Sequence, residues 1–459
     1  MARSRNRRLA DLTSGGAAGQ LADTLYAFFL RGLNLGSGRL RLCVALSGGR
    51  DSVVLLHALN RMVAAGELPL SLSALHVHHG LSPNADAWMN FCRRSCEPLN
   101  VPLEVVRVDV PRDSGEGLEA AARRKRHAVF ARVEADALAL AHHRDDQSET
   151  VLLNLLRGAG IAGAAGMLAV RPQASGPVLI RPLLDAPRTL IEAYAEECGL
   201  EWIDDESNED THYRRNFLRR DILPNLEQKF PGARQSLARA AGHFAEGAGL
   251  LDELAALDFA ALATPGGRIG LAGINSLSPA RARNLLRYAW VAAGFRAPEA
   301  RWIDEALKQL ATTAAASETC LATPDGELYV YRGELYIVPH RPPVPQEPLP
   351  WGGEEVLDWA GGKVRFVPSR GEGIRRSLLC EGGIFLQPRL GGERLQPYPK
   401  RPRRNLRNLL QEAGIPPWER ERLPCLWLAG KLVWVGGLGV DQGGVCAPGE
   451  EGVLPAWES

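Results

Sequence analysis

Short apolar runs alternate with longer helix-like stretches in the N-terminal part of the sequence, and this alternation limits the folds that the chain can adopt. The apolar runs are residues 40–46, 72–78, 103–108 and 137–141, and the helix-like stretches are residues 51–64, 84–99, 118–135 and 145–157. Strands that recur with helices between them are typical of βαβ units, whose strands are parallel. We therefore predict an α/β fold with a doubly wound parallel sheet. Because such sheets bind ligands at the carboxyl ends of their strands, the segments after the first and fourth runs are candidate sites.

After the α/β pattern the residue pattern of the sequence changes, which indicates further domains, as expected for 459 residues. Residues 236–313 predict helices, hairpins are predicted around Arg332-Gly333 and Ala429-Gly430, and six prolines within residues 339–350 indicate a stiff linker. We predict a basic tail with a first helix (1–39), the α/β domain (40–232), a mostly helical domain ending in a hairpin (233–338), the linker (339–350) and a small mixed α+β domain (351–459).

Composition and charge argue against several classes of protein. Hydrophobic residues make up 45% and charged residues 23%, which is ordinary for a globular chain. The formal net charge is +1, so any binding of nucleic acid must come from local patches. No apolar run is long enough to span a bilayer, and the four arginines in residues 1–10 are not followed by the apolar stretch of a secretory signal. We expect a cytoplasmic protein without membrane contact.

The eight cysteines do not form a metal-binding pattern. None belongs to a C-x-x-C pair, and although Cys92 and Cys96 are four residues apart, no second pair or histidine cluster completes a zinc pattern. Reduced cysteines of a cytosolic protein are the simpler interpretation. We therefore predict no metal site made of protein ligands alone.

One loop carries a clear chemical signal. The first apolar run leads directly into Ser47-Gly48-Gly49-Arg50-Asp51-Ser52, where a helix is predicted to begin. The glycines allow a close backbone approach, and N–H groups at a helix N-terminus bind anions such as phosphate. Since Asp51 places a carboxylate in this anion site, we expect Mg²⁺ to bridge it to the phosphates. S-G-G alone fits a glycine turn with Asp51 as helix N-cap equally well, but the flanking strand and helix and the final D-S favour a phosphate loop.

Several segments resemble one known family. S-G-G-x-D-S after a first strand is similar to the loop of N-type ATP pyrophosphatases, which adenylate a substrate and release pyrophosphate. The further segments resemble bacterial tRNA(Ile)-lysidine synthetases, with His78 and His127 as small departures from the family pattern. These segments are H-V-H-H-G-L (76–81), E-A-A-A-R-R-K-R (119–126), A-H-H-R-D-D-Q-S-E-T (141–150), R-P-L-L (181–184), D-E-S-N (205–208), Y-R-R-N (213–216) with Arg219, G-G-E-R (391–394) and L-Q-E-A-G-I-P-P-W (410–418).

The resemblance implies a Rossmann-like ATP pyrophosphatase domain at residues 40–232 and a two-step reaction. ATP adenylates O2 of the wobble cytidine in an isoleucine tRNA with a CAU anticodon, and pyrophosphate leaves. The ε-amine of free L-lysine then displaces AMP at C2 to form lysidine. ATP and Mg²⁺ would bind at Ser47, Gly48, Gly49, Arg50, Asp51 and Ser52.

The same motifs contain the candidate catalytic arginines. Adenylation creates negative charge on a phosphate, which cations and backbone donors stabilise. Arg123 and Arg219 fall inside matching motifs, so we expect them, rather than Arg126, to clamp phosphates or the flipped base. A lone arginine on a helix is more often simply solvated.

Acidic residues at the start of the helix after the fourth strand are the candidates for the second step. Asp146 and Glu149 are three residues apart and share a helix face, where they can hold a cationic amino acid and take its proton. Helix capping explains one or two acids there, but Asp145 together with the preceding histidines exceeds that need. We predict that His142 lies near the adenylate. The predicted catalytic set is Asp51, Arg123, His142, Asp146, Glu149 and Arg219.

Two basic runs are candidates for binding tRNA phosphates. The denser one is Lys400-Arg401-Pro402-Arg403-Arg404 with Arg407, in the domain that would bind tRNA, and the other combines Arg214-Arg215 with Arg219-Arg220. A charge run is usually a solvated face, but the first is unusually dense. Tyr398 and Trp418 either stack on bases or pack within the protein. A homodimer is one possible assembly.

Three rival functions make different predictions. A related tRNA thiolase of the cytidine type relies on C-x-x-C pairs, and this sequence has none. A glutamine-dependent synthetase needs an amidotransferase domain or partner, for which no nucleophilic cysteine context is evident. A non-catalytic RNA- or nucleotide-binding protein would not need Asp51, Asp146 and Glu149, so loss of activity in Asp51→Ala distinguishes it from an enzyme.

Overall fold

The computed structural model describes residues 16–32, 38–111, 118–173, 175–204, 214–313, 319–379 and 383–458. The N-terminal basic run, Asp205-Glu206-Ser207-Asn208, Tyr213 and Cys380 lie outside these residues. The chain forms two compact units that divide between Leu251 and Asp252. Within the described residues, no helix is both long and apolar enough to cross a membrane.

A six-stranded sheet forms the centre of the first unit, in the order β3-β2-β1-β4-β6-β5. All neighbouring strands are parallel except β5, which runs antiparallel to β6 at the edge. This confirms the predicted parallel α/β sheet. The strands are β1 (Leu40–Ala45), β2 (Leu70–His78), β3 (Leu103–Arg107), β4 (Ala137–Ala139), β5 (Val170–Arg171) and β6 (Val178–Ile180).

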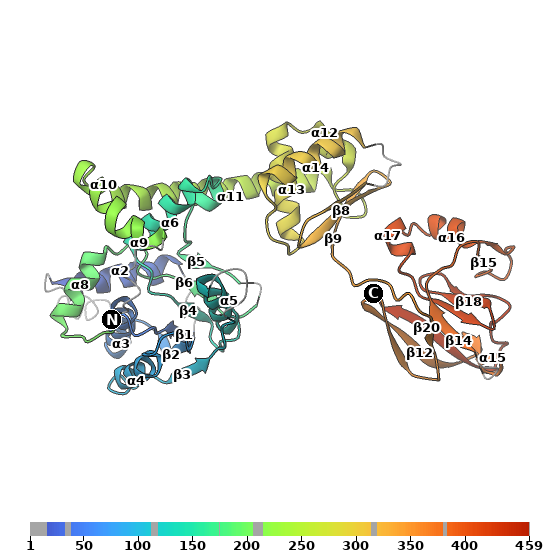
Figure 1. Ribbon diagram of the computed structural model, residues 1–459, viewed down its shortest axis with the longest axis horizontal. Helices are drawn as coiled ribbons and strands as arrows, with labels where there is room; N and C mark the ends of the chain where they lie inside the picture. The colour runs from blue at the N-terminus through green and yellow to red at the C-terminus, as the bar shows by residue number, and fades with distance from the viewer. Residues whose placement is uncertain are drawn as a thin grey trace, which may run out of the picture. The chain divides into compact units, whose positions relative to one another are not determined.

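Helices cover both faces of this sheet, as Figure 1 shows. The helices that pack on it are α2 (Ala17–Gly32), α3 (Arg50–Ala64), α4 (Ala85–Cys96), α5 (Leu118–Phe130) and α8 (Arg188–Glu197). Between β4 and β5 the chain also forms α6 (Arg144–Leu156) and α7 (Ile161–Ala164). Alternate residues of β1 belong to two cores: Leu42 and Val44 pack with α2, α3 and α8, whereas Cys43 packs in a cluster with Phe130 of α5. A strand buried on both faces explains why the first apolar run is nearly continuous.

The chain then continues through α9 (Arg214–Phe217), the π-helix η2 (Leu218–Ile222), α10 (Leu223–Lys229) and the long α11 (Ala233–Leu262). A π-helix widens the helical turn and is often found at functional sites. It lies here in the segment that carries Arg219.

The second unit begins with helices packed against a three-stranded antiparallel sheet. The elements are α12 (Leu271–Ser276), α13 (Pro279–Ala292), α14 (Ala300–Thr312), β7 (Thr319–Ala322), β8 (Gly326–Tyr331) and β9 (Glu334–Pro339). The predicted hairpin is present, since β8 and β9 flank Arg332 and Gly333, whose φ angles of 52° and 75° suit a two-residue hairpin turn.

Two antiparallel sheets follow in the same unit. One contains β10 (Leu349–Pro350), β14 (Ile384–Gln387), β17 (Cys425–Leu428), β18 (Lys431–Val435) and β19 (Gly439–Val440); the other contains β11 (Val356–Trp359), β12 (Gly362–Arg370), β20 (Glu451–Glu458) and β13 (Ile374–Arg375). The remaining elements are β15 (Arg394–Leu395), β16 (Arg404–Asn405), α15 (Arg376–Leu379), α16 (Leu406–Glu412) and α17 (Pro417–Arg420). The second predicted hairpin joins β17 to β18. The proline-rich segment ends in β10 and therefore contributes a strand.

Candidate active site

The carboxyl ends of β1 and β4 lie side by side where the strand order reverses. β1 pairs in parallel with β2 on one side and with β4 on the other. A crevice outside such a reversal point is where open α/β sheets bind their ligands. The fold thus brings residues 46–49, which follow β1, next to residues 140–143, which follow β4.

The predicted phosphate loop is a tight turn held by its own serines. The Ser47 N–H donates to Ser52 Oγ (3.2 Å), the Gly49 N–H donates to Ser47 Oγ (3.3 Å), and Ser52 Oγ donates to the Gly49 carbonyl (2.8 Å). Gly48 has φ +91°, and a Cβ there would lie 2.8 Å from Ile203 Cδ1. The turn requires glycine at this position and directs the chain into the N-terminus of α3, a geometry suited to anions.

Asp51 is the second residue of α3. The N-cap of this helix is Gly49, so the alternative reading of Asp51 as the N-cap is wrong. Asp51 Oδ1 is buried and lacks a hydrogen-bond partner among the described residues; Arg50 Nε lies 3.8 Å from it. Burial raises the pKa of Asp51, and the neighbouring His143 partly offsets this.

His143 links the phosphate loop to α6. It is the N-cap of α6: its ring Nδ1 accepts from the backbone N–H of Asp146 (3.4 Å), and its backbone N–H donates to Asp146 Oδ2 (3.1 Å). Because Nδ1 accepts, Nε2 carries the hydrogen. That Nε2 lies 3.6 Å from Asp51 Oδ2 and 3.4 Å from Asp146 Oδ2. One imidazole therefore lies between carboxylates from two different strand–helix connections, which makes the two segments one site.

Two arginines neutralise the acidic face of α6. Arg219 donates to both carboxylate oxygens of Glu149 (2.6 and 2.9 Å) and to Asp146 Oδ1 (3.1 Å). Arg215 donates to Glu149 Oε2 (2.9 Å) and to the same Asp146 oxygen (3.2 Å). Asp146 and Glu149 thus share a helix face as predicted, and Glu149 is only 2% exposed. Both carboxylates are thus paired with guanidinium groups, which compensate for their burial.

The charges around Asp146 keep it ionised. Burial alone would raise its pKa, but the neighbouring His143 and the charge of Arg215 outweigh that effect and hold the pKa below its ordinary value. The Asp145 side chain does not join this network. It accepts the Arg188 N–H (3.1 Å) and pairs with Arg234 Nε (3.0 Å), so it ties α6 to α8 and α11.

His142, one residue before the N-cap, is a different kind of group. Its Nδ1 is buried without a hydrogen-bond partner among the described residues. Burial lowers its pKa to about 3, and nearby arginines, including Arg181, act in the same direction while Asp146 opposes it. His142 is therefore a neutral imidazole at the edge of the acid–arginine network.

Other predicted site residues are placed differently. Arg123 is an exposed residue of α5. The Arg50 side chain pairs with Glu192 Oε1 (2.9 Å) and lies over the Trp202 ring, so it is directed toward α8. His76 is buried and its Nδ1 lies 2.9 Å from the Leu46 carbonyl oxygen, so it packs within the protein.

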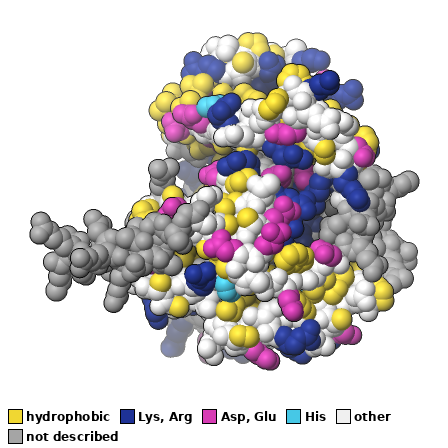
Figure 2. All heavy atoms as spheres, turned by 90° about the vertical axis from the view of Figure 1, so that its left-hand side faces the viewer, with side chains coloured by type: hydrophobic (Ala, Val, Ile, Leu, Met, Phe, Trp, Pro, Cys, Tyr) yellow, Lys and Arg dark blue, Asp and Glu magenta, His cyan; other side chains and the backbone are white. Residues whose placement is uncertain are grey.

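The basic run at residues 214–220 is not a free surface patch. Arg215 and Arg219 point inward to the acids of α6, and their sequence spacing of four on one helical face explains this shared target. Both side chains are therefore engaged in ion pairs within the protein, and a tRNA contact of this run stays a prediction. On the face of the first unit shown in Figure 2, basic and acidic side chains are interspersed.

Part of the C-terminal basic run is also paired. Arg403 contacts Asp441 (2.5 Å) and Arg404 contacts Glu412 (2.5 Å), while Lys400 and Arg407 are exposed. Of the two predicted aromatic residues in this unit, one is packed and one is exposed. Trp418 stacks on Tyr329 with ring centroids 4.1 Å apart, so it packs within the protein, whereas Tyr398 is half exposed with Arg401 over its ring.

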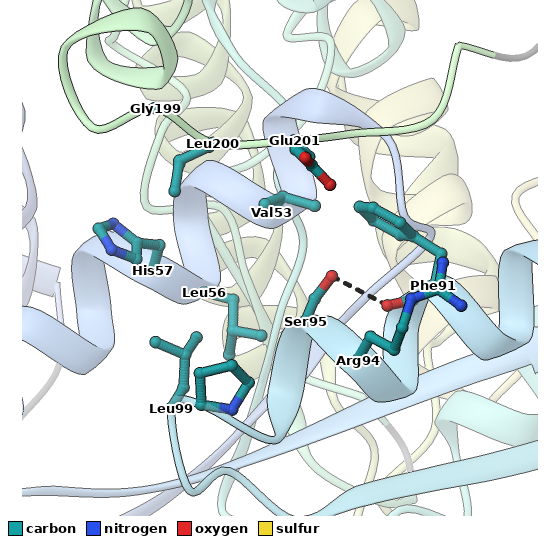
Figure 3. Close-up of a pocket in the computed structure, with 11 residues that line it drawn as sticks. Val53, Leu56, His57, Phe91, Arg94, Ser95, Leu99, Gly199, Leu200 and Glu201 are labelled. Carbon is teal, nitrogen blue, oxygen red and sulfur yellow. Dashed lines mark hydrogen bonds between the residues drawn. The ribbon is translucent and has the colours of Figure 1, made fainter.

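Two hollows lie in the first unit. One of about 500 Å³ lies at the carboxyl ends of β2 and β3 and is lined by residues 78–81 and 107–110. The other, of about 340 Å³, lies between α3 and α4 and is shown in Figure 3, with Val53 and His57 on one helix and Phe91 and Arg94 on the other. None of the predicted site residues lines the second hollow, which is covered by residues 199–201.

The protein offers no metal cage of its own in its described part: no group of three or more His, Cys, Asp or Glu side chains there is arranged to hold a metal ion. The unpartnered Asp51 Oδ1 fits the way Mg²⁺ binds with nucleotides, through one or two carboxylates together with substrate phosphates and water.

Reasoning from the sequence missed two residues. His143 was noted only as a neighbour of the helix, although its position directly before an acidic helix start is a signal for an N-cap. Arg181 was noted only as part of a matching motif, yet it is 5% exposed at the end of β6.

Comparison with known proteins identifies the family. Three family models match: the PP-loop domain at residues 22–226, the TilS substrate binding domain at residues 271–336 and the TilS substrate C-terminal domain at residues 384–457. The tRNA(Ile)-lysidine synthase of Aromatoleum aromaticum is 47% identical over 92% of this chain and 98% of that protein. The chain belongs to the tRNA(Ile)-lysidine synthase family. The family protein of Azoarcus sp. is 45% identical over 94% of each chain, and that of Nitrosomonas europaea is 42% identical over 91% of this chain and 92% of that protein.

Solved structures give a more distant likeness. The U34-tRNA thiolase NcsA from Methanococcus maripaludis matches 50% of this chain and 79% of its own with a TM-score of 0.42 and 19% identity. As a tRNA(Ile)-lysidine synthase family member with a PP-loop domain, the chain is an ATP-using ligase.

Proposed function

We propose that this protein ligates free L-lysine to C2 of the wobble cytidine in an isoleucine tRNA with a CAU anticodon, through an adenylated cytidine. Family membership and the printed name of the relatives support this reaction. The observation that supports it most is the position of His143 between Asp51 and Asp146, because it links the predicted phosphate loop to the acidic residues at the start of α6.

The phosphate loop and Asp51 would hold ATP. The N–H groups at the start of α3 are suited to the phosphates, and the hollow beyond β2 and β3 offers room for the nucleoside. Asp51 would hold Mg²⁺ through its unpartnered Oδ1. When bound, Mg²⁺ neutralises charge on the phosphates. Gly48 and Gly49 keep the backbone close enough for these contacts.

Asp146 and Glu149 would bind the lysine. They already bind two guanidinium groups, which supports their suitability for an organic cation. Asp146 stays ionised under ordinary conditions because its pKa is lowered, so it can hold a protonated amine or receive its proton. We further propose that Arg219 orients this acid pair, that Arg123 contacts phosphate from α5, and that neutral His142 lies against the adenylate.

The second unit would bind the body of the tRNA. Lys400 and Arg407 are exposed and suited to phosphate contacts, and Tyr398 presents an aromatic face. The five predicted segments, a cytoplasmic location and a homodimer stay predictions.

The test is incorporation of labelled lysine into RNA. Purified protein is incubated with ATP, Mg²⁺, radiolabelled lysine and an isoleucine tRNA transcript with a CAU anticodon. We expect ATP-dependent label in the RNA that is lost in Asp51→Asn, a change that keeps the shape of the side chain. Pyrophosphate release without label would contradict lysine as the nucleophile. Neither product from a folded protein would overturn the proposed reaction.

A further inference from the structure

A buried arginine next to the site has no counterion among the residues that the structure describes. Arg181 directly follows β6, is 5% exposed, and donates from Nη1 to the Leu168 carbonyl (2.7 Å). Its Nε is buried and has no hydrogen-bond partner, and within the described part of the chain Arg181 forms no ion pair. A buried charge normally has a partner because its desolvation is costly. Arg181 therefore has an unused donor and an unbalanced positive charge.

The surroundings of Arg181 are also basic. Burial, together with the charges of Arg171 and Arg123, lowers its pKa to about 10. His127 of α5 is within reach of the same charges, and its ring packs edge-to-face on Phe130 (5.7 Å), which anchors α5 on the sheet. Cations from β5, β6 and α5 thus gather at one place, an arrangement that favours an anion.

The sheet places this cluster beside the candidate active site. β4 and β6 are parallel neighbours with Ala139 opposite Ile180, and the Leu140 N–H donates to the Ile180 carbonyl (2.9 Å). Arg181 and His142 therefore leave adjacent strands at the same edge of the sheet. Each has a buried nitrogen without a hydrogen-bond partner among the described residues, so this edge of the sheet carries two unsatisfied polar groups.

We propose that Arg181 binds a backbone phosphate of the RNA next to the nucleotide being modified and so positions that nucleotide. A phosphodiester offers one negative charge and two acceptor oxygens, which suits a guanidinium with an unused Nε. The phosphate loop that would serve ATP lies on the other side of β4, after β1, so we assign the Arg181 anion to the RNA. The inference rests on the proposed function and adds a positioning residue to it.

The experiment combines a neutral RNA linkage with a variant. Synthetic tRNAs carry a methylphosphonate, which removes one charge, on the 5′ or the 3′ side of the wobble cytidine. With the wild-type protein we expect one of the two to lower kcat/KM about 10- to 100-fold, the usual loss when a charged hydrogen bond is removed. Arg181→Met should cause a similar loss on unmodified RNA and make the protein insensitive to that linkage. Arg181→Lys should restore part of the activity.

The matched control is Arg41→Met, because Arg41 lies at the start of β1 and pairs with Asp136 (2.7 Å). It should leave both RNA responses unchanged. Neutral linkages without effect on the wild type overturn the proposal even if Arg181→Met fails to fold. A raised KM for ATP in Arg181→Met, with no linkage effect, also overturns it and assigns the anion to the nucleotide. If unmodified RNA is not modified at all, the proposed function fails. The Kd values of the same RNAs then decide the phosphate contact.

Discussion

Replacement of Glu149 by glutamine tests the acid–arginine network directly. The change keeps the shape of the side chain and removes one negative charge from a group that accepts three hydrogen bonds from Arg215 and Arg219. Both guanidiniums would keep a single anionic partner, Asp146 Oδ1. The amide of glutamine can accept with its oxygen, but its NH₂ group faces a guanidinium N–H and adds a repulsive contact.

The size of the effect follows from burial. Removal of one partner from a fully buried ion pair costs about 3–5 kcal/mol. Arg215 and Arg219 are 33% and 26% exposed, so water recovers part of this loss. We expect the free energy of unfolding to fall by about 2–3 kcal/mol, which in a domain of this size lowers the midpoint by about 4–12 °C.

Thermal unfolding followed by circular dichroism measures this change, with Glu196→Gln as the control because Glu196 is an exposed residue of α8. The control should unfold within about 1 °C of the wild type, since exposed substitutions change stability little. A Glu149→Gln midpoint equal to that of the control would refute the argument that the network stabilises the fold. Under the proposed function the same variant should also raise the KM for lysine more than the KM for ATP.

Three further changes have defined outcomes. Gly48→Ala should raise the KM for ATP and lower the free energy of unfolding by about 1–3 kcal/mol, because φ is +91° there and Ile203 is close; kinetics and urea unfolding measure the two effects. In the unfolded chain His142 takes up a proton as the pH falls below its ordinary pKa of 6.5, whereas in the folded protein it does so only at a pH of about 3. Stability should therefore fall as the pH falls through that window, and His142→Asn should flatten the decline of melting temperature between pH 7 and pH 5. Trp418→Ala should destabilise the second unit by about 2–4 kcal/mol in urea titrations, because ring contacts including that with Tyr329 contribute about 0.5–1.5 kcal/mol each.

The sequence predicted the parallel sheet well because local patterns specify it. Each predicted strand and helix of residues 40–157 is present with its ends displaced by a few residues. Two hairpins were predictable from residue pairs that tolerate positive φ, namely Arg332-Gly333 and Ala429-Gly430. The strand in the proline-rich segment was not, because Leu349–Pro350 becomes a strand only through its partner β14.

The positions of the charged side chains were less predictable. A basic run in a sequence fits a solvated face, an RNA contact or an internal ion pair equally well, and Arg215 and Arg219 reach Asp146 and Glu149 across more than sixty residues of sequence. Such pairing depends on where α9 and η2 dock, and no local pattern reports that.

His143 shows why the site as a whole needed the structure. From the sequence, Asp51 and Asp146 belong to two separate helix starts, each of which a capping role would explain. In the fold, β1 and β4 are neighbours, so those helix starts converge and His143 Nε2 lies within 4 Å of both carboxylates. Capping requires only one acceptor at each helix, whereas the structure places two carboxylates around one imidazole and leaves Asp51 Oδ1 without a hydrogen-bond partner among the described residues. A carboxylate that keeps one oxygen buried without a hydrogen bond, close to a second carboxylate, costs stability unless a ligand completes it, and this favours a binding role for Asp51 over a structural one.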